Sequence, residues 1–232
     1  MEPTRWLSRA IMPQGRAAHS GRWAEPKDDG EIVYRLYYSA VFQVVGRVDE
    51  SAGRAWYKIR DKGGRRFYAP AEALRPLSPS DLSPLSPGVS NKRIIVGVNA
   101  QRLVAYEGNR IVYETRVSTG RSWFGGDGTA QDFSTPVGDH RVYSKWIADH
   151  MKGADFDLPG VGWVTYFTES GAGIHATYWH NDFGHPRSHG CVNVTPEAAK
   201  WIFRWTTPEV PYYPGLARGR GNSTPISVQY ET

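Results

Sequence analysis

Cysteine and long apolar runs are what this sequence has least of. Only one cysteine, Cys191, occurs in 232 residues, so no disulfide can form within the chain. No apolar stretch approaches the roughly 18 residues that a membrane-spanning helix needs. Residues 1–22 contain arginines and one tryptophan but no continuous apolar segment of the kind found in secretory signal peptides. We therefore expect a folded chain without disulfides, without an integral membrane segment and without a visible export signal.

Charge of one sign is not concentrated anywhere along the chain. The formal net charge is +5, but lysine and arginine are spread throughout the sequence. A basic protein is attracted to polyanions such as nucleic acid, anionic lipid or a bacterial wall. Zinc-finger spacing, an RNP-like aromatic motif and a basic helix are all missing, so we expect no nucleic-acid partner and assign the charge to solubility.

What the sequence does contain is typical of a folded, β-rich protein. Hydrophobic residues make up 40% and charged residues 22%, which is unlike the composition of a disordered chain. Aromatic residues reach 13%, including nine tryptophans, and such residues favour strands and surfaces that hold extended ligands. The length of 232 residues fits one large domain or two small ones.

Composition divides the chain into four zones. Residues 1–23 show no periodicity and are expected to form a flexible lead-in. Residues 24–77 have the pattern of a compact β domain, and residues 91–232 have that of a larger second domain. The segment between them, residues 78–90, is rich in proline and serine, which favours an extended, semi-rigid linker.

The first domain is expected to be a small barrel of short strands. Four strands rich in β-branched and aromatic residues are predicted, over residues 33–38, 41–48, 56–59 and 66–69. The run from Tyr68 to Pro76 resembles the closing segment of bacterial SH3-like domains. The alternative interpretation is a β-hairpin cap on the second domain.

The second domain is expected to be mostly β with one or two short helices. Its predicted strands lie over residues 93–98, 102–106, 110–117 and 225–230. Helical patterns occur over residues 144–152 and 196–205. In the second of these, Thr195 is an N-cap, Pro196 takes the first helical position and Glu197 lies in the first turn.

The chemistry of the chain is concentrated between residues 173 and 193. This stretch places the only cysteine beside four of the seven histidines, which are His175, His180, His185 and His189. A reactive cysteine needs a base, because the thiolate is the nucleophile and an unperturbed thiol has a pKa near 8.5. It also needs preformed donors for the developing oxyanion, and the backbone of a glycine-containing turn such as residues 188–191 can supply them.

Two other readings of the cysteine remain open at this point. A lone cysteine can be a buried structural thiol. Cysteine and histidine also bind zinc, but separations of five, five, four and two residues match neither a zinc finger nor the His-Glu-x-x-His helix. We therefore expect no metal site.

The pattern around the cysteine resembles the signature of L,D-transpeptidase catalytic domains. In that resemblance Ile174-His175 is followed, after a gap, by Ser-His-Gly-Cys-Val-Asn at residues 188–193. Residues 117–120 and 135–138 match the family's S-T-G and T-P-x-G segments, and residues 178–184 resemble a lid-like stretch in one of its branches. The resemblance spans about residues 91–230, and an SH3-like module in front of such a domain is a familiar arrangement.

The resemblance implies a mixed β-sandwich and a role for each motif residue. Cys191 matches the acylated nucleophile and His175 the general base, whose ring is oriented by the carbonyl of residue 176. The backbone at His189 and Gly190, together with Cys191 itself, matches the oxyanion hole. Ser188 and Asn193 match positions that shape the pocket.

Three further side chains are candidates for substrate contact. Arg187 has the fork of donors that a stem-peptide carboxylate accepts, but it is equally a solvated loop charge. Tyr178 and Trp179 either stack on the ligand or cover the core. His180 and His185 are expected to be surface or pocket-wall residues rather than substrate contacts.

The implied reaction forms peptidoglycan cross-links without a cofactor. The cysteine attacks the carbonyl before the terminal D-alanine of a tetrapeptide stem, and an amine on a neighbouring stem resolves the thioester. Hydrolysis of the same acyl-enzyme gives an L,D-carboxypeptidase instead, and a non-catalytic wall-binding module is a further alternative. The resemblance also implies acylation by carbapenems and an extracytoplasmic location in the cell wall or periplasm, and we expect a monomer.

Overall fold

The computed structural model describes residues 5–9, 21–26, 31–49, 54–61, 64–124 and 130–231. The chain packs as two units, the first comprising Met1–Asp81 with Ala148–Gly162 and the second Leu82–Ile147 with Trp163–Thr232. The fold is mainly β, with mixed sheets and one α-helix among the residues described, which confirms the fold class expected from the sequence. Within the residues described, no helix is both long enough and apolar enough to cross a membrane.

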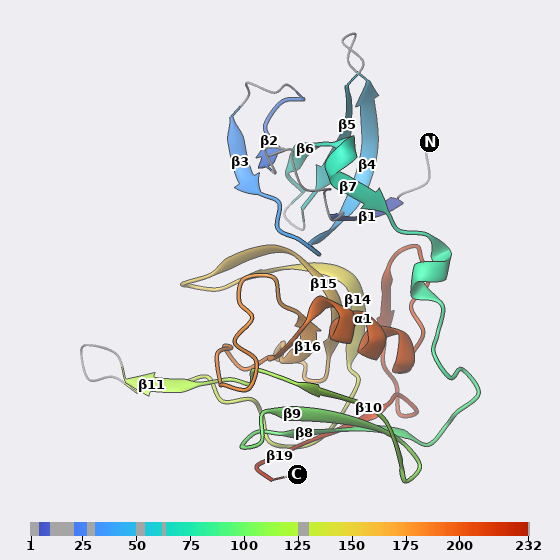
Figure 1. Ribbon diagram of the computed structural model, residues 1–232, viewed down its shortest axis with the longest axis vertical. Coiled ribbons are helices and arrows are strands. Elements are labelled where there is room, and N and C mark those ends of the chain that lie inside the picture. The colour runs from blue at the N-terminus through green and yellow to red at the C-terminus, as the bar shows by residue number, and fades with distance from the viewer. Residues whose placement is uncertain are drawn as a thin grey trace. The chain divides into compact units, whose positions relative to one another are not determined.

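The first unit contains one seven-stranded sheet, whose order is β3-β2-β6-β5-β4-β1-β7 (Figure 1). Its strands are β1 (Arg5–Arg9), β2 (Gly21–Trp23), β3 (Ile32–Arg35), β4 (Val41–Asp49), β5 (Ala55–Arg60), β6 (Arg66–Pro70) and β7 (Leu74–Pro76). A short 3₁₀ helix, η1 (Ala71–Ala73), precedes β7. All four predicted strands are present, although the first ends at Arg35 instead of continuing to residue 38. The barrel of an SH3-like domain stays a prediction.

Two segments of residues 1–23, the part of the chain predicted to be a flexible lead-in, are strands. Strand β1 pairs with both β4 and β7, and β2 pairs with both β3 and β6. Trp6 on β1 is 7% exposed and joins the core. These segments lack the alternation that marks a strand in the sequence, and they are ordered by backbone pairing with partners distant along the chain.

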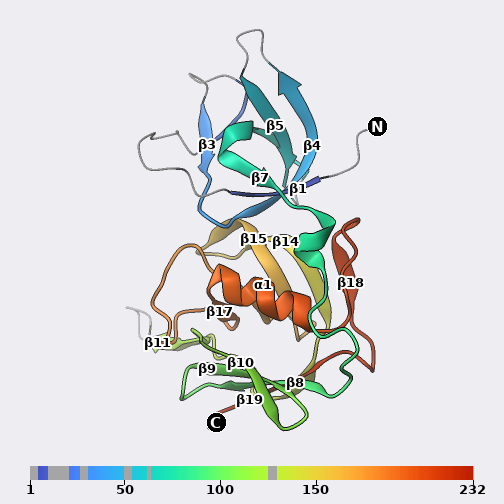
Figure 2. The same ribbon diagram turned by 45° about the vertical axis from the view of Figure 1, so that its right-hand side comes forward.

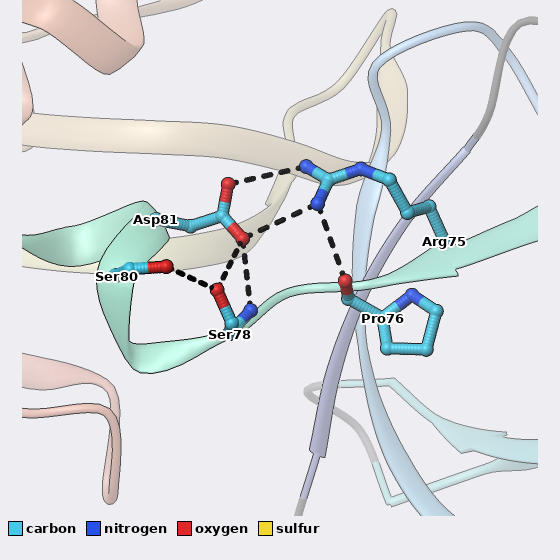
Figure 3. Close-up of polar contacts among 5 residues, drawn as sticks. All are labelled: Arg75, Pro76, Ser78, Ser80 and Asp81. Carbon is cyan, nitrogen blue, oxygen red and sulfur yellow. Dashed lines mark hydrogen bonds and ion pairs between the residues drawn. The ribbon is translucent and has the colours of Figure 1, made fainter.

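The proline- and serine-rich segment begins with a hydrogen-bonded turn (Figure 3). Ser78 precedes the 3₁₀ helix η2 (Pro79–Leu82), and its N–H donates to the Asp81 carboxylate at 2.8 Å. This backbone-to-carboxylate bond is one of the two bonds of a capping box, and proline takes the first position of the helix. Arg75 on β7 pairs with Asp81 at 3.2 Å, so an ion pair links β7 to the start of the segment predicted as a linker.

Two five-stranded sheets and a two-stranded ribbon are formed mainly by the second unit, and residues 148–162 of the first unit supply parts of two of their strands (Figures 1 and 2). The first sheet has the order β10-β9-β8-β19-β13, and the second has the order β17-β16-β15-β14-β18. The strands are β8 (Lys92–Gly97), β9 (Arg102–Glu107), β10 (Arg110–Arg116), β13 (Gly138–Arg141), β14 (Ser144–Lys152), β15 (Asp157–Tyr166), β16 (Gly173–Ala176), β17 (Val192–Val194), β18 (Leu216–Arg218) and β19 (Pro225–Gln229), and the ribbon is β11 (Ser122–Phe124) with β12 (Ala130–Asp132). Strands β8 and β19 are parallel, as are β16 and β17, whereas β9 is antiparallel to both β8 and β10.

The helix predicted over residues 144–152 is wrong, because this segment is strand β14. Lys145, Ile147 and Asp149 are buried, while the residues between them are half-exposed. That period of two is the pattern of a strand. It was hidden in the sequence because a lysine and an aspartate occupy buried positions.

The helix predicted over residues 196–205 is confirmed as α1 (Pro196–Trp205), and Figure 2 shows it beside β17. The Thr195 hydroxyl accepts a hydrogen bond from the backbone N–H of Ala198 at its N-terminus. Beyond its C-terminal end, the buried Lys145 ammonium donates to the carbonyls of Thr206 and Pro208 at 2.7 Å, and burial lowers the pKa of this lysine to about 7. Because α1 begins two residues after β17 ends, its fixed ends also hold that strand in place.

Candidate active site

The candidate nucleophile and base lie on adjacent parallel strands. His175 is on β16, and Cys191 is the residue that precedes β17. His175 pairs in register with Asn193, and Ile174 pairs with Val192. Paired residues and residues two apart on one strand project to the same face, so Cys191, Asn193 and His175 face the same side of this sheet.

The Cys191 thiol lies against the turn that leads into β16. The residue is partly exposed, and its Sγ is 3.6 Å from the Gly171 carbonyl oxygen. Burial of the thiol raises the pKa of Cys191 to about 11, partly offset by a hydrogen bond from the Gly173 backbone. The thiol is therefore protonated at neutral pH unless a neighbouring base accepts its proton.

His175 is held in the orientation that a base requires. Its side chain is 2% exposed, and Nδ1 is 3.1 Å from the carbonyl oxygen of Ala176. Because a carbonyl only accepts, Nδ1 carries the proton and Nε2 is the nitrogen that can take one up. The Trp179 ring lies 5.8 Å from the imidazole, and Tyr178 in turn meets Trp179 edge-on at 5.0 Å.

The turn before the cysteine is closed by the Ser188 hydroxyl. Gly190 has φ +104°, a conformation that glycine adopts without strain, and its N–H donates to Ser188 Oγ at 3.2 Å. Ser188 Oγ in turn donates to the Cys191 carbonyl. The predicted oxyanion donor at Gly190 is thus engaged within the turn in this structure. His189 is exposed, and its ring packs edge-on against Phe133 at 4.6 Å.

Residues 117–120 run beside this turn and are bonded to it through their backbone. Ser118 bridges to Asn193, with each backbone N–H donating to the other's carbonyl at 2.9 Å. Gly120 bridges to Ser188 in the parallel sense. The S-T-G segment noted in the sequence therefore runs alongside the cysteine-bearing segment.

The segment of residues 180–187 is hydrogen-bonded to residues 117–120 as well. The Asp182 carbonyl accepts from the Ser118 hydroxyl at 2.9 Å. The Asp182 carboxylate accepts from Arg187 Nε at 2.7 Å and lies 3.0 Å from His185 Nδ1. The hydrogen bond from Arg187, together with His185, lowers the pKa of Asp182. Arg187, a candidate for binding a substrate carboxylate, thus already shares its guanidinium with a carboxylate of the protein.

His180 connects this segment to the candidate catalytic strand. Its Nδ1 accepts from the backbone N–H of Asp182 at 3.2 Å, and its Nε2 is 2.9 Å from the Asn193 side-chain amide. Burial lowers the pKa of His180, Arg187 adds to this effect, and Asp182 opposes it. The Asn193 atom that faces Nε2 is the amide nitrogen Nδ2, and Asn193 Oδ1 is buried without a hydrogen-bond partner among the described residues. A neutral ring that carries its proton on Nε2 would need the amide turned over, with Oδ1 as the acceptor. From its sequence position His180 was expected at the surface or in the pocket wall, and the structure adds this contact with the motif asparagine.

Sequence reasoning missed the backbone that touches the thiol. Gly171 lies in the turn before β16 and Gly173 is the first residue of that strand, and nothing in their local pattern marks them as neighbours of Cys191. The ion pair of Asp182 with Arg187 was also missed, although both residues lie within the motif stretch. Among the residues that the structure describes, no group of three or more His, Cys, Asp or Glu side chains is arranged to hold a metal ion.

Gly120→Ala is expected to unfold or strongly destabilise the protein. A Cβ at this position would lie 1.8 Å from the Phe133 carbonyl oxygen and 3.0 Å from the Gly190 Cα, and backbone atoms cannot move aside cheaply. We expect a loss of about 3 kcal/mol or more in the free energy of unfolding, measured by urea denaturation. The matched control is Gly88→Ala, where nothing lies within 4 Å of the added atom. Equal stability of the two variants would contradict the tight packing described here.

Comparison with known proteins gives a family match and several solved structures. A family model described as YkuD, the L,D-transpeptidase catalytic domain, matches residues 91–225. No match was found among curated proteins. An L,D-transpeptidase mutant from Enterococcus faecium is 22% identical, with a TM-score of 0.44 over 61% of this chain and 51% of that chain. An L,D-transpeptidase from Mycobacterium smegmatis is 15% identical, with a TM-score of 0.47 over 96% of this chain and 82% of that chain.

A third solved structure, an L,D-transpeptidase from Xylanimonas cellulosilytica, is 26% identical, with a TM-score of 0.42 over 63% of each chain. This chain spans about half the length of the first two solved chains that it matches. The family assignment rests on the sequence match over residues 91–225 and not on these structures.

Proposed function

This chain belongs to the YkuD family of L,D-transpeptidase catalytic domains, and we propose that it cross-links peptidoglycan through a thioester on Cys191. The observation that carries the proposal is the placement of Cys191 beside β16, with the buried imidazole of His175 facing the same side of the sheet. The bond from His175 Nδ1 to Ala176 supports a base at Nε2. A thiol with a pKa of about 11 has little nucleophilic strength without such a base.

The first half-reaction would form the acyl-enzyme. His175 Nε2 takes the thiol proton, and the thiolate attacks the carbonyl carbon before the terminal D-alanine of a tetrapeptide stem. The negative charge moves to the carbonyl oxygen, where backbone N–H groups at His189, Gly190 and Cys191 are our candidate donors. The Gly190 N–H, which is bonded to Ser188 Oγ in this structure, would have to leave that bond to take part. Collapse breaks the carbon–nitrogen bond, the imidazolium returns the proton to the leaving amine, and D-alanine departs.

The second half-reaction would resolve the thioester. The side-chain amine of a neighbouring stem attacks the same carbonyl carbon, and His175 accepts one of its protons. The carbon–sulfur bond then breaks, the thiolate recovers that proton, and a new peptide bond joins the two stems. Water in place of the amine would give a free carboxylate, which is the L,D-carboxypeptidase alternative.

The remaining candidate residues would shape the pocket. We propose that Ser188 and Asn193 hold its walls, because both are buried and bonded to neighbouring segments. Tyr178 and Trp179 would contact the stem peptide beside the histidine. Arg187 would reach a substrate carboxylate only through donors that its pairing with Asp182 leaves unused.

The surrounding organisation is proposed with the same function. We propose an SH3-like domain over residues 24–77, a linker over residues 78–90 and a catalytic domain over residues 91–232, acting as a monomer outside the cytoplasm on peptidoglycan. Within the catalytic domain proposed here, residues 148–162 pack with the first unit. A non-catalytic wall-binding role is the second candidate, in which the basic net charge of +5 and the SH3-like domain would supply the affinity for the wall.

Product analysis with a defined donor and acceptor tests the function. The purified full chain is incubated with a tetrapeptide stem, with and without a second stem that carries a free side-chain amine, and the products are weighed by mass spectrometry. Release of D-alanine with a cross-linked dimer is the expected result. If tripeptide is the only acyl product, the protein acts as an L,D-carboxypeptidase. If the donor stays unchanged while the protein is folded, the non-catalytic wall-binding role is supported.

A further inference from the structure

We infer that Thr135 and Gln101 are positioning residues that fix the orientation of Cys191 through its backbone carbonyl. The inference rests on the proposed function, because it concerns the geometry of the same nucleophile. Neither residue touches the thiol in the contacts described above. They act through hydrogen bonds to the segment that carries it.

The direction of the Thr135 hydroxyl is determined by its partners. Thr135 is 2% exposed, and its Oγ1 accepts a hydrogen bond from the backbone N–H of Gly120 at 2.8 Å. An amide N–H only donates, so the single hydroxyl proton of Thr135 is left for another acceptor. The Cys191 carbonyl oxygen is that acceptor, at 3.4 Å.

Two hydroxyls therefore converge on one carbonyl. Ser188 Oγ accepts from the Gly190 N–H and donates to the same Cys191 oxygen. A carbonyl oxygen has two lone pairs, and both have a donor here. The peptide plane that follows Cys191 is fixed from two sides, which restricts the direction in which its Cα–Cβ bond carries the sulfur.

Gln101 hydrogen-bonds to Thr119, the residue that precedes Gly120. Gln101 is 3% exposed and has φ +48°, in the left-handed region. Its side-chain amide donates to the Val98 carbonyl and to Thr119 Oγ1, each at 2.6 Å, and accepts from the Thr119 N–H at 2.9 Å. All the polar atoms of this amide are engaged in fixing the backbone on either side of it.

Thr119, whose backbone is held by Gln101, is in turn hydrogen-bonded to the segment that carries the cysteine. Its carbonyl accepts from the backbone N–H groups of Arg187 and Ser188, at 2.9 and 3.0 Å. The next residue, Gly120, is the donor to Thr135. A path of hydrogen bonds thus runs from Gln101 through residues 119–120 to Ser188 and Thr135, and both of these end on Cys191.

The consequence for catalysis is a loss of alignment and not a loss of the nucleophile. If Thr135 loses its hydroxyl, Ser188 still holds one lone pair of the Cys191 carbonyl, so the turn persists but its peptide plane gains freedom. A misplacement of about 1 Å in a reacting group can reduce a rate by about 100-fold. We therefore expect slower acylation at unchanged stoichiometry.

The test compares Thr135→Val, Thr135→Ser and the parent full chain. The readouts are the second-order rate of carbapenem adduct formation by intact-protein mass spectrometry, and kcat and KM for the tetrapeptide donor. We expect Thr135→Val to lower the acylation rate and kcat by about 10- to 100-fold with little change in KM, and Thr135→Ser to recover a rate within a few-fold of the parent. The control is Thr165→Val, since Thr165 is equally buried and its hydroxyl has no hydrogen-bond partner among the described residues.

Each outcome separates the inference from the proposed function. A parent that reacts while Thr135→Val reacts equally fast overturns the inference and leaves the function standing. A parent that forms no adduct and no product overturns the function and the inference together. If Thr135→Val melts below the assay temperature, Gln101→Met tests the same path, and parent-like acylation by that variant overturns the inference.

Discussion

Cys191→Ala is expected to abolish both carbapenem acylation and turnover of the tetrapeptide donor. The parent should gain the mass of one carbapenem per molecule, and the variant should gain none. Loss of a covalent nucleophile removes the acyl-enzyme route itself, so turnover should fall on the order of 10⁵-fold or more, to background. Intact-protein mass spectrometry measures the first effect, and product analysis with the donor peptide measures the second.

This loss should occur without damage to the fold. Cys191 is partly exposed, and in the bonds described above its backbone carbonyl, which alanine retains, holds the turn to Thr135 and Ser188. We expect the melting temperature of the variant to stay close to that of the parent. An adduct on the folded variant, or cross-linked product from it, would show that another group is the nucleophile.

The candidate site was predictable from the sequence where its residues are close along the chain. Ser188, Gly190 and Cys191 lie in one turn, and the glycine with positive φ stands where the motif has it. Thr195 and Pro196 begin a helix as their capping preferences predict. Hairpins over 92–107 and 102–116 follow from β-branched runs separated by turn residues. Signals of this kind are local, and a single sequence carries them.

What the sequence could not provide are features made by distant partners. Strand β1 exists because β4 and β7 flank it, and its own residues show no alternation. Strand β14 was predicted as a helix because Lys145, a charged residue, occupies a buried position and hides the period of two. The carbonyls that accept hydrogen bonds from this lysine lie about sixty residues away. From the sequence, Arg187 is a candidate substrate ligand because the sequence does not reveal its pairing with Asp182. That pairing exists only once the segment folds back on itself. In each case the deciding interaction is tertiary and overrides the local pattern.

His175→Asn is expected to slow acylation at neutral pH and to make it steeply dependent on pH. Asparagine retains a donor near the Nδ1 position, which can still reach the Ala176 carbonyl, but it removes the base at Nε2. With a thiol pKa of about 11, roughly 1 molecule in 3,000 carries a thiolate at pH 7.5 without help. We therefore expect a fall in the acylation rate of about 10³- to 10⁴-fold at that pH, measured with a carbapenem by mass spectrometry.

The pH profile distinguishes loss of a base from simple damage. An acid is increasingly ionised as pH rises toward its pKa, so the thiolate fraction of His175→Asn should increase about tenfold per pH unit between pH 7 and pH 9.5. The acylation rate of the variant should rise in parallel, whereas the parent, whose base takes the proton locally, should vary much less. A flat profile at a low rate would indicate a misfolded site. A rate within about tenfold of the parent at pH 7.5 would assign the base to another group, and His180, which bonds to Asn193 opposite His175, is the first to examine.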